Sequence, residues 1–428
     1  MNKTNKSKAL MPKLRFPEFQ GTDKWSLTTI GEIGSFYYGK SAPKWSLKDD
    51  APTLCVRYGE LYTKFETIIS SVFSRTVINP KNLRFSRGGE VLVPRVGEKP
   101  EDFGKHCCYL PLKNIAIGEM ISVFETKEIP LFYTFYFRNL YKQFARVVEG
   151  QNVKNLYYKE LEPLKICRPS RKEQQKIADC LSSLDELITT QSQKIETLKQ
   201  HKKGLMQNLF PVEGQTTPKL RFPELQNTGE WKEKKLGDCF KNTGGTALEK
   251  YVVDTGDYHF ISIGNYSTDG KYIDKGQRIK INDITKTKLL NKDDLVMVLN
   301  DKTASGDIIG STIHIKECNK YIYNQRSERL IINSKLLPTF SWFILNSKTV
   351  RKEIYRKSQG GTQIYVNFSN IKTISILIPE IKEQQKIADC LSSLDELITT
   401  QSQKIETLKQ HKKGLMQQLF PNLEAINE

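Results

Sequence analysis

The chain has 428 residues, 38% of them hydrophobic, which suffices for two or three domains with cores of their own. No run of 18 uncharged apolar residues occurs and no apolar stretch follows the basic N-terminal segment, so we expect neither secretion nor membrane insertion and predict a cytoplasmic protein. The formal net charge of +18 favours a polyanionic partner, because Lys and Arg release counterions condensed on phosphates; an inert basic surface is the alternative.

The first element in chain order is an opening segment at residues 12–25, PKLRFPEFQGTDKW, which returns at residues 218–231 as PKLRFPELQNTGEW. The motif IGE at residues 30–32 follows the first copy, and LGD at residues 236–238 follows the second. Internal repeats define the units from which a fold is built. The chain therefore consists of two halves that begin alike.

Residues 34–41, GSFYYGKS, formally match the phosphate-loop pattern GxxxxGK[ST]. A phosphate loop follows a buried strand, opens a helix and uses small residues so that backbone N–H groups can surround a phosphate. Here the intervening residues are bulky, Pro43 follows closely, and the preceding segment is polar. We therefore expect no nucleotide binding. An ATP-using enzyme that loses ATP binding on Lys40→Ala is the alternative.

No catalytic or metal-binding set is predicted. The five histidines form no evident catalytic group, and the eight cysteines include no CxxC pair and no Cys/His cluster at zinc spacing. We expect free, buried thiols and no catalysis in this chain.

The regions between the repeated segments share little sequence, although their ends align. Strand-like runs such as EVLVPRV at residues 90–96 and DLVMVL at residues 294–299 predict a mixed sheet in each region. Residues 1–171 carry a net charge of +11 and residues 210–381 one of +7, so the basic excess lies in these regions. The pattern predicts one fold that carries two different surfaces.

Candidate DNA contacts are Arg, Lys, Gln, Asn and Tyr side chains in polar or Gly-flanked loops, because such side chains bind base edges and phosphates. They are Arg57, Tyr58, Arg95, Lys99, Gln151 and Asn152 in the first region, and Lys302, Gln325, Arg326, Gln363 and Tyr365 in the second. A solvated surface role is the alternative for each, and a structural pairing with Glu328 is a further alternative for Arg326.

Residues 172–207 return unchanged as residues 382–417, and each copy continues to LFP after one position that differs. Apolar residues in each copy repeat with a four-three spacing, which predicts a coiled-coil seam rather than an ordinary core helix. The seam consists of Ile177, Leu181, Leu184, Ile188, Ile195, Leu198, Leu205, Ile387, Leu391, Leu394, Ile398, Ile405, Leu408 and Leu415. Ser170 and Glu173 predict a capping box at the start of the first helix, whereas the second helix lacks the Ser.

Two identical helices in one chain can pair with each other. At 1.5 Å per residue, about 38 residues give a rod of roughly 55 Å, which spans about 16 base pairs of DNA. An antiparallel pair would place the two variable regions at its opposite ends, as reading of a split DNA site requires.

The predicted fold is α+β, with two variable domains separated by an intramolecular antiparallel coiled coil and related by a pseudo-twofold axis. We expect the first variable domain at residues 1–170, the first helix at 171–211, the second variable domain at 212–379, the second helix at 380–421 and a tail at 422–428.

The whole pattern resembles the specificity (S) subunit of type I restriction-modification systems. The resemblance rests on the helix motif EQQKIADCLSSLDELI, on the opening segments and on the closing patterns GQNVKNLYYKELEPLKICRP and GGTQIYVNFSNIKTISILIP. It implies that each domain recognises one half of a bipartite site on double-stranded DNA. It also implies two methyltransferase (M) subunits and restriction (R) subunits as partners, with S-adenosylmethionine and ATP bound by those partners.

A coiled-coil adaptor whose globular domains bind proteins is the second function considered. It predicts binding that persists in high salt and shows no preference for a DNA sequence.

Overall fold

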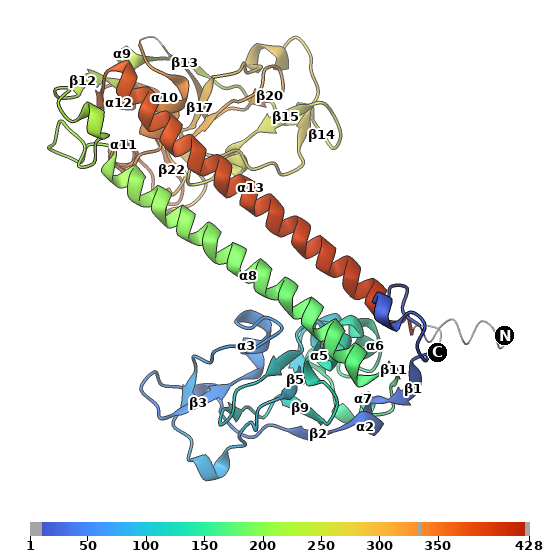
Figure 1. The fold of residues 1–428 in the computed structure, drawn as a ribbon. Coiled ribbons are helices and arrows are strands. Elements are labelled where there is room, and N and C mark those ends of the chain that lie inside the picture. Colours follow the sequence, from blue (N-terminus) through green and yellow to red (C-terminus); the bar gives the residue numbers. More distant parts are fainter. Residues whose placement is uncertain (1–10, 333–334, 424–428) are drawn as a thin grey trace. The chain divides into compact units, whose positions relative to one another are not determined.

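The computed structural model describes residues 11–332 and 335–423, which form two compact units. Unit 1 comprises the chain up to Gln193 together with residues from Ser402 onward, and unit 2 comprises Lys194–Gln401. Each unit therefore contains one of the two diverged regions and part of each long helix (Figure 1).

Unit 1 is built on a four-stranded antiparallel sheet. Its strands, in spatial order, are β2 (Gly34–Tyr38), β9 (Ile121–Thr126), β5 (Glu90–Pro94) and β7 (Cys108–Leu110). Smaller sheets pair β4 (Arg75–Thr76), β3 (Thr53–Val56) and β8 (Ala116–Ile117), β1 (Ser26–Thr29) with β11 (Lys165–Arg168), and β6 (Val96–Gly97) with β10 (Lys154–Asn155). The helices are α2 (Ile30–Ile33), α3 (Tyr58–Thr63), α4 (Pro100–Lys105), α5 (Pro130–Asn139), α6 (Tyr141–Arg146) and α7 (Tyr158–Leu161).

Unit 2 repeats the main sheet of unit 1 and differs in its second sheet, which has four strands instead of three. Its antiparallel sheet has the order β13 (Phe240–Gly244), β21 (Ser327–Ile332), β17 (Leu295–Val298) and β19 (Thr312–His314). Smaller sheets pair β14 (Val252–Val253), β16 (Arg278–Ile279), β15 (Tyr258–Ile261) and β20 (Tyr321–Tyr323), β12 (Lys232–Lys235) with β23 (Ser375–Ile378), and β18 (Asn300–Asp301) with β22 (Ile364–Tyr365). The helices are α9 (Leu236–Cys239), α10 (Pro338–Leu345), α11 (Lys348–Arg356) and α12 (Phe368–Ile371).

Short 3₁₀ helices complete both units. They lie at Pro17–Phe19, Lys44–Ser46 and Pro80–Asn82 in unit 1, and at Pro223–Leu225, Glu249–Tyr251, Ile263–Asn265 and Thr285–Lys288 in unit 2.

The predicted α+β class is confirmed, and the runs EVLVPRV and DLVMVL contain strands β5 and β17. The prediction of a mixed sheet in each unit is confirmed by the sheets β4-β3-β8 and β14-β16-β15-β20, although the predicted strands β5 and β17 lie in other sheets. The main sheets are wholly antiparallel, and the parallel pairs are β3 with β8 and β15 with β20 in the smaller sheets. Strand patterns show burial, not strand direction, so the sequence could not distinguish these arrangements.

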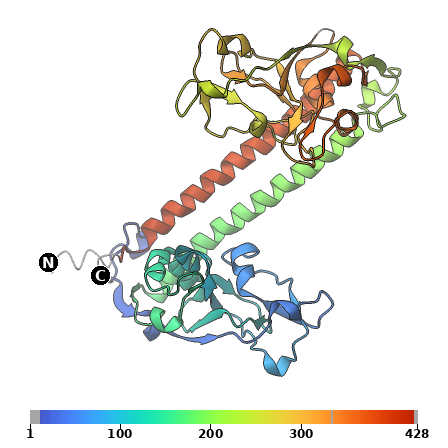
Figure 2. The ribbon, with the colours of Figure 1, turned by 180° about the vertical axis from the view of Figure 1, so that it is seen from behind.

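The repeated segments form the long helices α8 (Arg171–Asn208) and α13 (Ile381–Leu419), which Figures 1 and 2 show as continuous. In unit 1 the start of α8 lies against the end of α13, where Asp185 forms an ion pair with Lys412. In unit 2 the same two sequence positions meet in reverse, and Lys202 Nζ lies 2.6 Å from Asp395 Oδ2. In each unit the two helical segments therefore run antiparallel.

Burial along both helices repeats with four-three spacing. Every position assigned to the seam is buried or half-buried, as are Gln191 and Lys202, which occupy polar places in the series. Leu187 and Leu397, which lie off the seam, are exposed. An apolar series with polar members at fixed places is typical of a coiled coil.

Each opening segment binds both long helices within its unit. Arg15 Nε and Nη2 donate to the two Glu173 carboxylate oxygens at 2.7 Å each, near the start of α8. Next to Arg15, Leu14 N donates to Gln418 O, at the end of α13. Arg221 binds Glu383 in the same bidentate way in unit 2, at 2.8 and 2.6 Å. The opening segment recurs because the helix residues that it binds recur.

The prediction of a capping box at the start of α8 is half wrong. Glu173 N donates to Ser170 Oγ at 3.3 Å, as expected. The Glu173 carboxylate, which a capping box would use to accept from the backbone of Ser170, is bound by Arg15 instead. A partner 158 residues away therefore replaces the local one.

The LFP ends of the two repeats complete the cores of the units. Phe420 stacks on Tyr136 and lies against Phe132 in unit 1. Phe210 lies against Trp231 and Phe340 in unit 2. The identical helix ends thus bury identical aromatic side chains in two different domains.

Candidate nucleic-acid interface

Three chain segments meet at the ends of the two central strands of each main sheet, in a backbone arrangement that we call the ladder. In unit 1, Arg95 N donates to Met120 O at 3.0 Å, and Leu156 N donates to Arg95 O at 2.8 Å. In unit 2, Leu299 N donates to Arg326 O and Val366 N donates to Leu299 O, both at 2.9 Å. Most of the candidate DNA contacts lie on these three segments or on the loops that leave them.

In unit 1 the ladder brings four candidates onto adjoining segments. Arg95 directly follows β5, and Lys99 lies between β6 and α4. The loop with Gln151 and Asn152 precedes β10, which pairs with β6. Both loop side chains and Lys99 are exposed.

Arg95 is the most constrained of these candidates. Its guanidinium lies over the rings of Tyr38 and Tyr157, at 4.6 and 5.4 Å from the ring centroids. Its Nε is buried and has no hydrogen-bond partner in the described part of the chain. Stacking fixes the plane of a guanidinium and leaves its outer N–H groups to bind a ligand.

The other two candidates of unit 1, Arg57 and Tyr58, begin α3, beside the ladder. Tyr62, one turn further along α3, donates its hydroxyl to Val96 O on β6 at 3.1 Å. Arg57 is half-buried, and its Nε donates to Ala42 O at 3.1 Å. Part of the Arg57 guanidinium therefore stabilises the protein's own loop.

In unit 2 all five candidates lie on the ladder segments. Gln325 and Arg326 form the turn between β20 and β21, Lys302 follows β18, and Gln363 and Tyr365 lie before and on β22. Lys302, Arg326, Gln363 and Tyr365 are exposed, and Gln325 is half-buried. The alternative pairing of Arg326 with Glu328 is not formed among the described residues, and the Glu328 carboxylate accepts a hydrogen bond from Asn242 at 3.0 Å.

The loops before β10 and β22 have the same conformation. Gly150 has φ +97° and Gly360 has φ +108°, and both are followed by a return of the chain to β10 or β22. A Cβ on Gly150 would lie 2.3 Å from Val153 O, and one on Gly360 would lie 1.9 Å from Gln363 O. Glycine is therefore required at both positions, and the loop residues that follow are free to differ.

Two basic residues that the sequence did not single out occupy equivalent places near the ladder. Arg84 Nη1 donates to Tyr38 O at 2.5 Å, and Lys288 Nζ donates to Gly244 O at 2.6 Å. Tyr38 and Gly244 are the last residues of β2 and β13. Because the two basic residues lie in dissimilar sequence, only the fold reveals that they correspond.

The formal phosphate-loop match has a different structure. Residues Gly34–Tyr38 form β2, paired with β9, and no helix follows them before the 3₁₀ turn at Lys44–Ser46. This segment is part of a sheet and has no N–H groups arranged around a phosphate site. Among the described residues, no three His, Cys, Asp or Glu side chains gather as a metal site would require.

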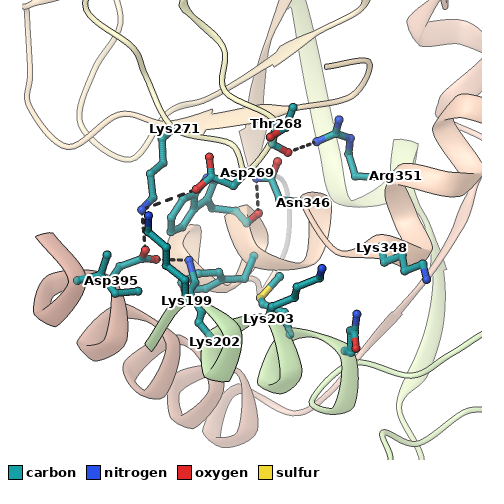
Figure 3. A pocket seen from close by; sticks show the side chains of 15 residues that line it. Lys199, Lys202, Lys203, Thr268, Asp269, Lys271, Asn346, Lys348, Arg351 and Asp395 are labelled. Atoms are coloured by element: carbon teal, nitrogen blue, oxygen red, sulfur yellow. Dashed lines mark hydrogen bonds and ion pairs between the residues drawn. The ribbon is translucent and has the colours of Figure 1, made fainter. Parts of the chain in front are cut away.

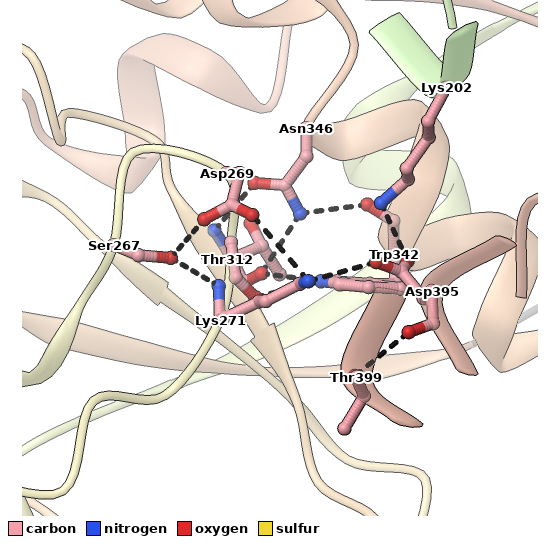
Figure 4. Close-up of polar contacts among 10 residues, drawn as sticks. Lys202, Ser267, Asp269, Lys271, Thr312, Trp342, Asn346, Asp395 and Thr399 are labelled. Atoms are coloured by element: carbon pink, nitrogen blue, oxygen red, sulfur yellow. Dashed lines mark hydrogen bonds and ion pairs between the residues drawn. The ribbon is translucent and has the colours of Figure 1, made fainter. Parts of the chain in front are cut away.

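The junction between domain and helices in unit 2 contains a hollow of about 630 Å³. Figure 3 shows Lys199, Lys202 and Lys203 on one side of it and Lys348 on another. Asp395 binds two cations there, Lys202 of α8 and Lys271 of the variable domain, whose Nζ lies 2.8 Å from Asp395 Oδ1 (Figure 4).

The same helix position has another environment in unit 1. Lys412 pairs with Asp185 and lies over the Phe135 ring at 5.1 Å. Burial lowers the pKa of Lys412, whereas the nearby Asp185 and Glu66 raise it. The repeated helices thus form an equivalent Lys–Asp ion pair in each unit, and the variable domain of each unit contacts its pair with different residues.

Comparison with known proteins gives a family. The model of the type I restriction modification DNA specificity domain matches residues 104–200 and 228–410, which is more than half of the chain. The chain belongs to this family. As a specificity subunit of a type I restriction enzyme it determines DNA target recognition and is not catalytic. The predicted family, function and non-catalytic role are confirmed.

Two relatives illustrate the similarity. The type I restriction enzyme MjaVIII specificity subunit of Methanocaldococcus jannaschii is 28% identical over 340 residues, which cover 73% of this chain and 75% of the relative. The HindI specificity subunit of Haemophilus influenzae is 23% identical over 209 residues, covering 46% of this chain and 42% of the relative.

Solved structures share the fold. The type I S subunit of M. genitalium superposes with a TM-score of 0.62 at 16% identity, covering 96% of this chain and 99% of that one. A chain from a structural study of complex assembly in a type I restriction-modification system gives 0.54 at 13% identity, covering 93% and 98%. No helix in the described ranges is both long and apolar enough to span a bilayer.

Proposed function

We propose that the specificity subunit recognises a bipartite site on double-stranded DNA, one half through the ladder of each unit. The observation that carries this proposal is that the ladders share their backbone hydrogen bonds but differ in side chains. Where unit 1 has Met120 and Arg95, unit 2 has Arg326 and Leu299. A retained frame with different polar groups is suited to binding two different short sequences.

The candidate DNA contacts named from the sequence are part of this proposal. Of the eleven, the loop residues Gln151, Asn152 and Gln363 and the turn residue Arg326 are exposed. Residues 1–170 and 212–379 would be the two target recognition domains. The continuous helices α8 and α13 join them, so we expect the two half-sites to be separated by a spacer of constant length.

The proposed partners are two methyltransferase subunits and the restriction subunits. Membership of the specificity family supports this assignment, as does the similarity to a chain described in a study of type I complex assembly. S-adenosylmethionine and ATP would bind to those partner subunits, and the described part of this chain contains no phosphate loop at residues 34–41.

A randomised-duplex selection tests the proposal. The chain is co-expressed with its candidate methyltransferase subunits, and bound DNA is sequenced at physiological salt. Two short fixed blocks separated by a constant random spacer are expected. Binding with no split motif, or binding that persists unchanged at high salt, would overturn the proposal and favour the protein-binding adaptor.

A further inference from the structure

The turns that lead into Met120 and Arg326 make two equivalent backbone hydrogen bonds, although Arg326 has a positive φ and Met120 does not. In unit 1, Gly118 N donates to Val56 O and Glu119 N donates to Ser41 O, at 2.9 and 3.1 Å. In unit 2, Asn324 N donates to Ile261 O and Gln325 N donates to Thr246 O, at 3.0 and 2.9 Å. Gly118-Glu119-Met120 and Asn324-Gln325-Arg326 are therefore equivalent turns.

Arg326 is held in a conformation that a non-glycine residue rarely adopts. Its φ is +69°, in the left-handed region, which costs of order 1 kcal/mol or more for a side chain without a local hydrogen bond. The turn is fixed on both sides of this residue, by Gln325 N bound to Thr246 O and by Arg326 O bound to Leu299 N. Strain of this kind persists where the surrounding structure fixes it, and it gathers at functional sites.

The turn borders a hollow of about 480 Å³ in unit 2. Gln325, Arg326 and Lys302 line it, together with Glu249. Glu249 Oε1 accepts hydrogen bonds from Asn324 Nδ2 at 2.8 Å and Gln325 Nε2 at 3.0 Å, and the bond from Asn324 lowers the pKa of the Glu249 carboxyl. This anchoring orients the amides of the turn.

The guanidinium of Arg326 remains available at the edge of this hollow. Arg326 is exposed, and its charge contributes to lowering the pKa of the Glu249 carboxyl, but among the described residues its side chain has no hydrogen-bond or ion-pair partner. Lys302 is exposed and has no such partner among these residues either. In the equivalent turn of unit 1, Glu119 is exposed and Met120 is half-buried. The two turns therefore present opposite charges at equivalent places.

A contact to phosphate would not require this difference, because phosphate is the same along every DNA sequence. The basic residues that donate to the ends of β2 and β13, Arg84 and Lys288, keep their charge in both units. The turn changes from Glu119-Met120 to Gln325-Arg326 while its backbone hydrogen bonds are kept, as we expect of residues that distinguish bases.

We propose that Arg326 is a specificity-determining residue that binds a guanine through O6 and N7 in the major groove. This inference rests on the proposed function and names one contact within it. An arginine fork paired with the guanine edge is the commonest specific contact between proteins and DNA. The backbone hydrogen bonds of the turn fix the position from which the Arg326 side chain extends, as a bidentate contact requires. The hollow beside the turn leaves space for the edge of a base.

The test uses the complex with methyltransferase subunits and two variants. Arg326→Gly suits the left-handed φ and removes the guanidinium, so the turn should fold without strain. Arg326→Gln keeps a bidentate group that prefers adenine. Arg356→Gln on α11 is the matched control, because it removes a charge from the same unit at a residue that pairs with Glu213 and Glu353.

In the randomised selection, Arg326→Gly should lose its preference for one G·C pair in one half-site and keep the other half-site intact. Its affinity for the wild-type target should fall by roughly 5- to 150-fold, the range for one bidentate base contact. Arg326→Gln should shift that position toward A·T. The control should select the wild-type motif.

Other outcomes overturn the inference. A uniform loss of affinity on all sequences with a salt slope smaller by about 1 would make Arg326 a phosphate contact. An unchanged motif in both Arg326 variants would exclude it from recognition. Both results leave the proposed function standing, whereas a wild-type complex that selects no split motif would refute the proposed function itself.

Discussion

The buried pair between Arg15 and Glu173 provides the sharpest test of how the opening segment is attached. Their side chains are 7% and 1% exposed, and both guanidinium bonds to the carboxylate are short. Glu173→Gln keeps the shape but removes the charge, which leaves a buried guanidinium without its counterion. Breaking such a pair from one side costs roughly 3–5 kcal/mol.

Hydrogen exchange followed by mass spectrometry measures this cost locally. Peptides from residues 12–25 and 218–231 differ in sequence and can be assigned to one unit, whereas peptides from the identical helices cannot. If the segment opens independently, its amides should exchange faster by about two to three and a half orders of magnitude in Glu173→Gln. Peptides from residues 218–231 should not change.

Glu383→Gln is the matched variant and should give the reverse result, because Arg221 binds Glu383 in the same way. Glu380→Gln removes the exposed partner of Lys232 and should have little effect. Equal changes in both opening segments, or a change in Glu173→Gln no larger than that in Glu380→Gln, would refute the reasoning.

Three further predictions concern unit 2. Lys302→Ala should weaken DNA binding by a similar factor on all sequences and reduce the salt slope by about 1; fluorescence anisotropy at several salt concentrations would show a sequence-dependent loss if Lys302 contacted a base instead. Gly360→Ala should weaken the sequence preference at one half-site in the duplex selection, because its Cβ would lie 1.9 Å from Gln363 O and displace the loop. An unaltered motif would mean that this loop lies away from DNA. Burial lowers the pKa of His314, despite its 2.9 Å contact with Asp293, so the folded unit resists its protonation and loses stability as pH falls below the unfolded pKa of about 6.5. Thermal unfolding at pH 7.5 and 5.5 should therefore show a smaller acid effect in His314→Gln than in wild type, and equal effects would contradict this sign.

The parts of the fold that sequence patterns could predict are those with local causes. The helices α8 and α13 could be predicted because the apolar spacing that makes them coiled-coil helices lies within each repeated segment. The role of Glu173 could not be predicted in that way, because Ser170 offers a nearby partner and Arg15 is distant in sequence.

The candidate site divides in the same manner. Loops beside Gly150 and Gly360 could be found because a required glycine marks a turn. The turn at Glu119 was missed because it contains no basic residue, and its correspondence with Gln325 depends on backbone hydrogen bonds that cross the sheet. Arg57 was chosen as a candidate for its charge, yet its Nε donates to Ala42 O. The sequence could not predict this hydrogen bond, because it depends on how the two segments pack.

The identity of the two long helices has a consequence for assembly. Because residues 172–207 and 382–417 are the same, every neighbouring chain carries a partner helix as good as the one within the chain. Affinity cannot distinguish the two pairings, so the choice depends on the effective concentration of the partner helix that belongs to the same chain. At ordinary protein concentrations the chain closes on itself. A chain cut between its halves would lose that advantage, and each half would instead find its partner in a second copy.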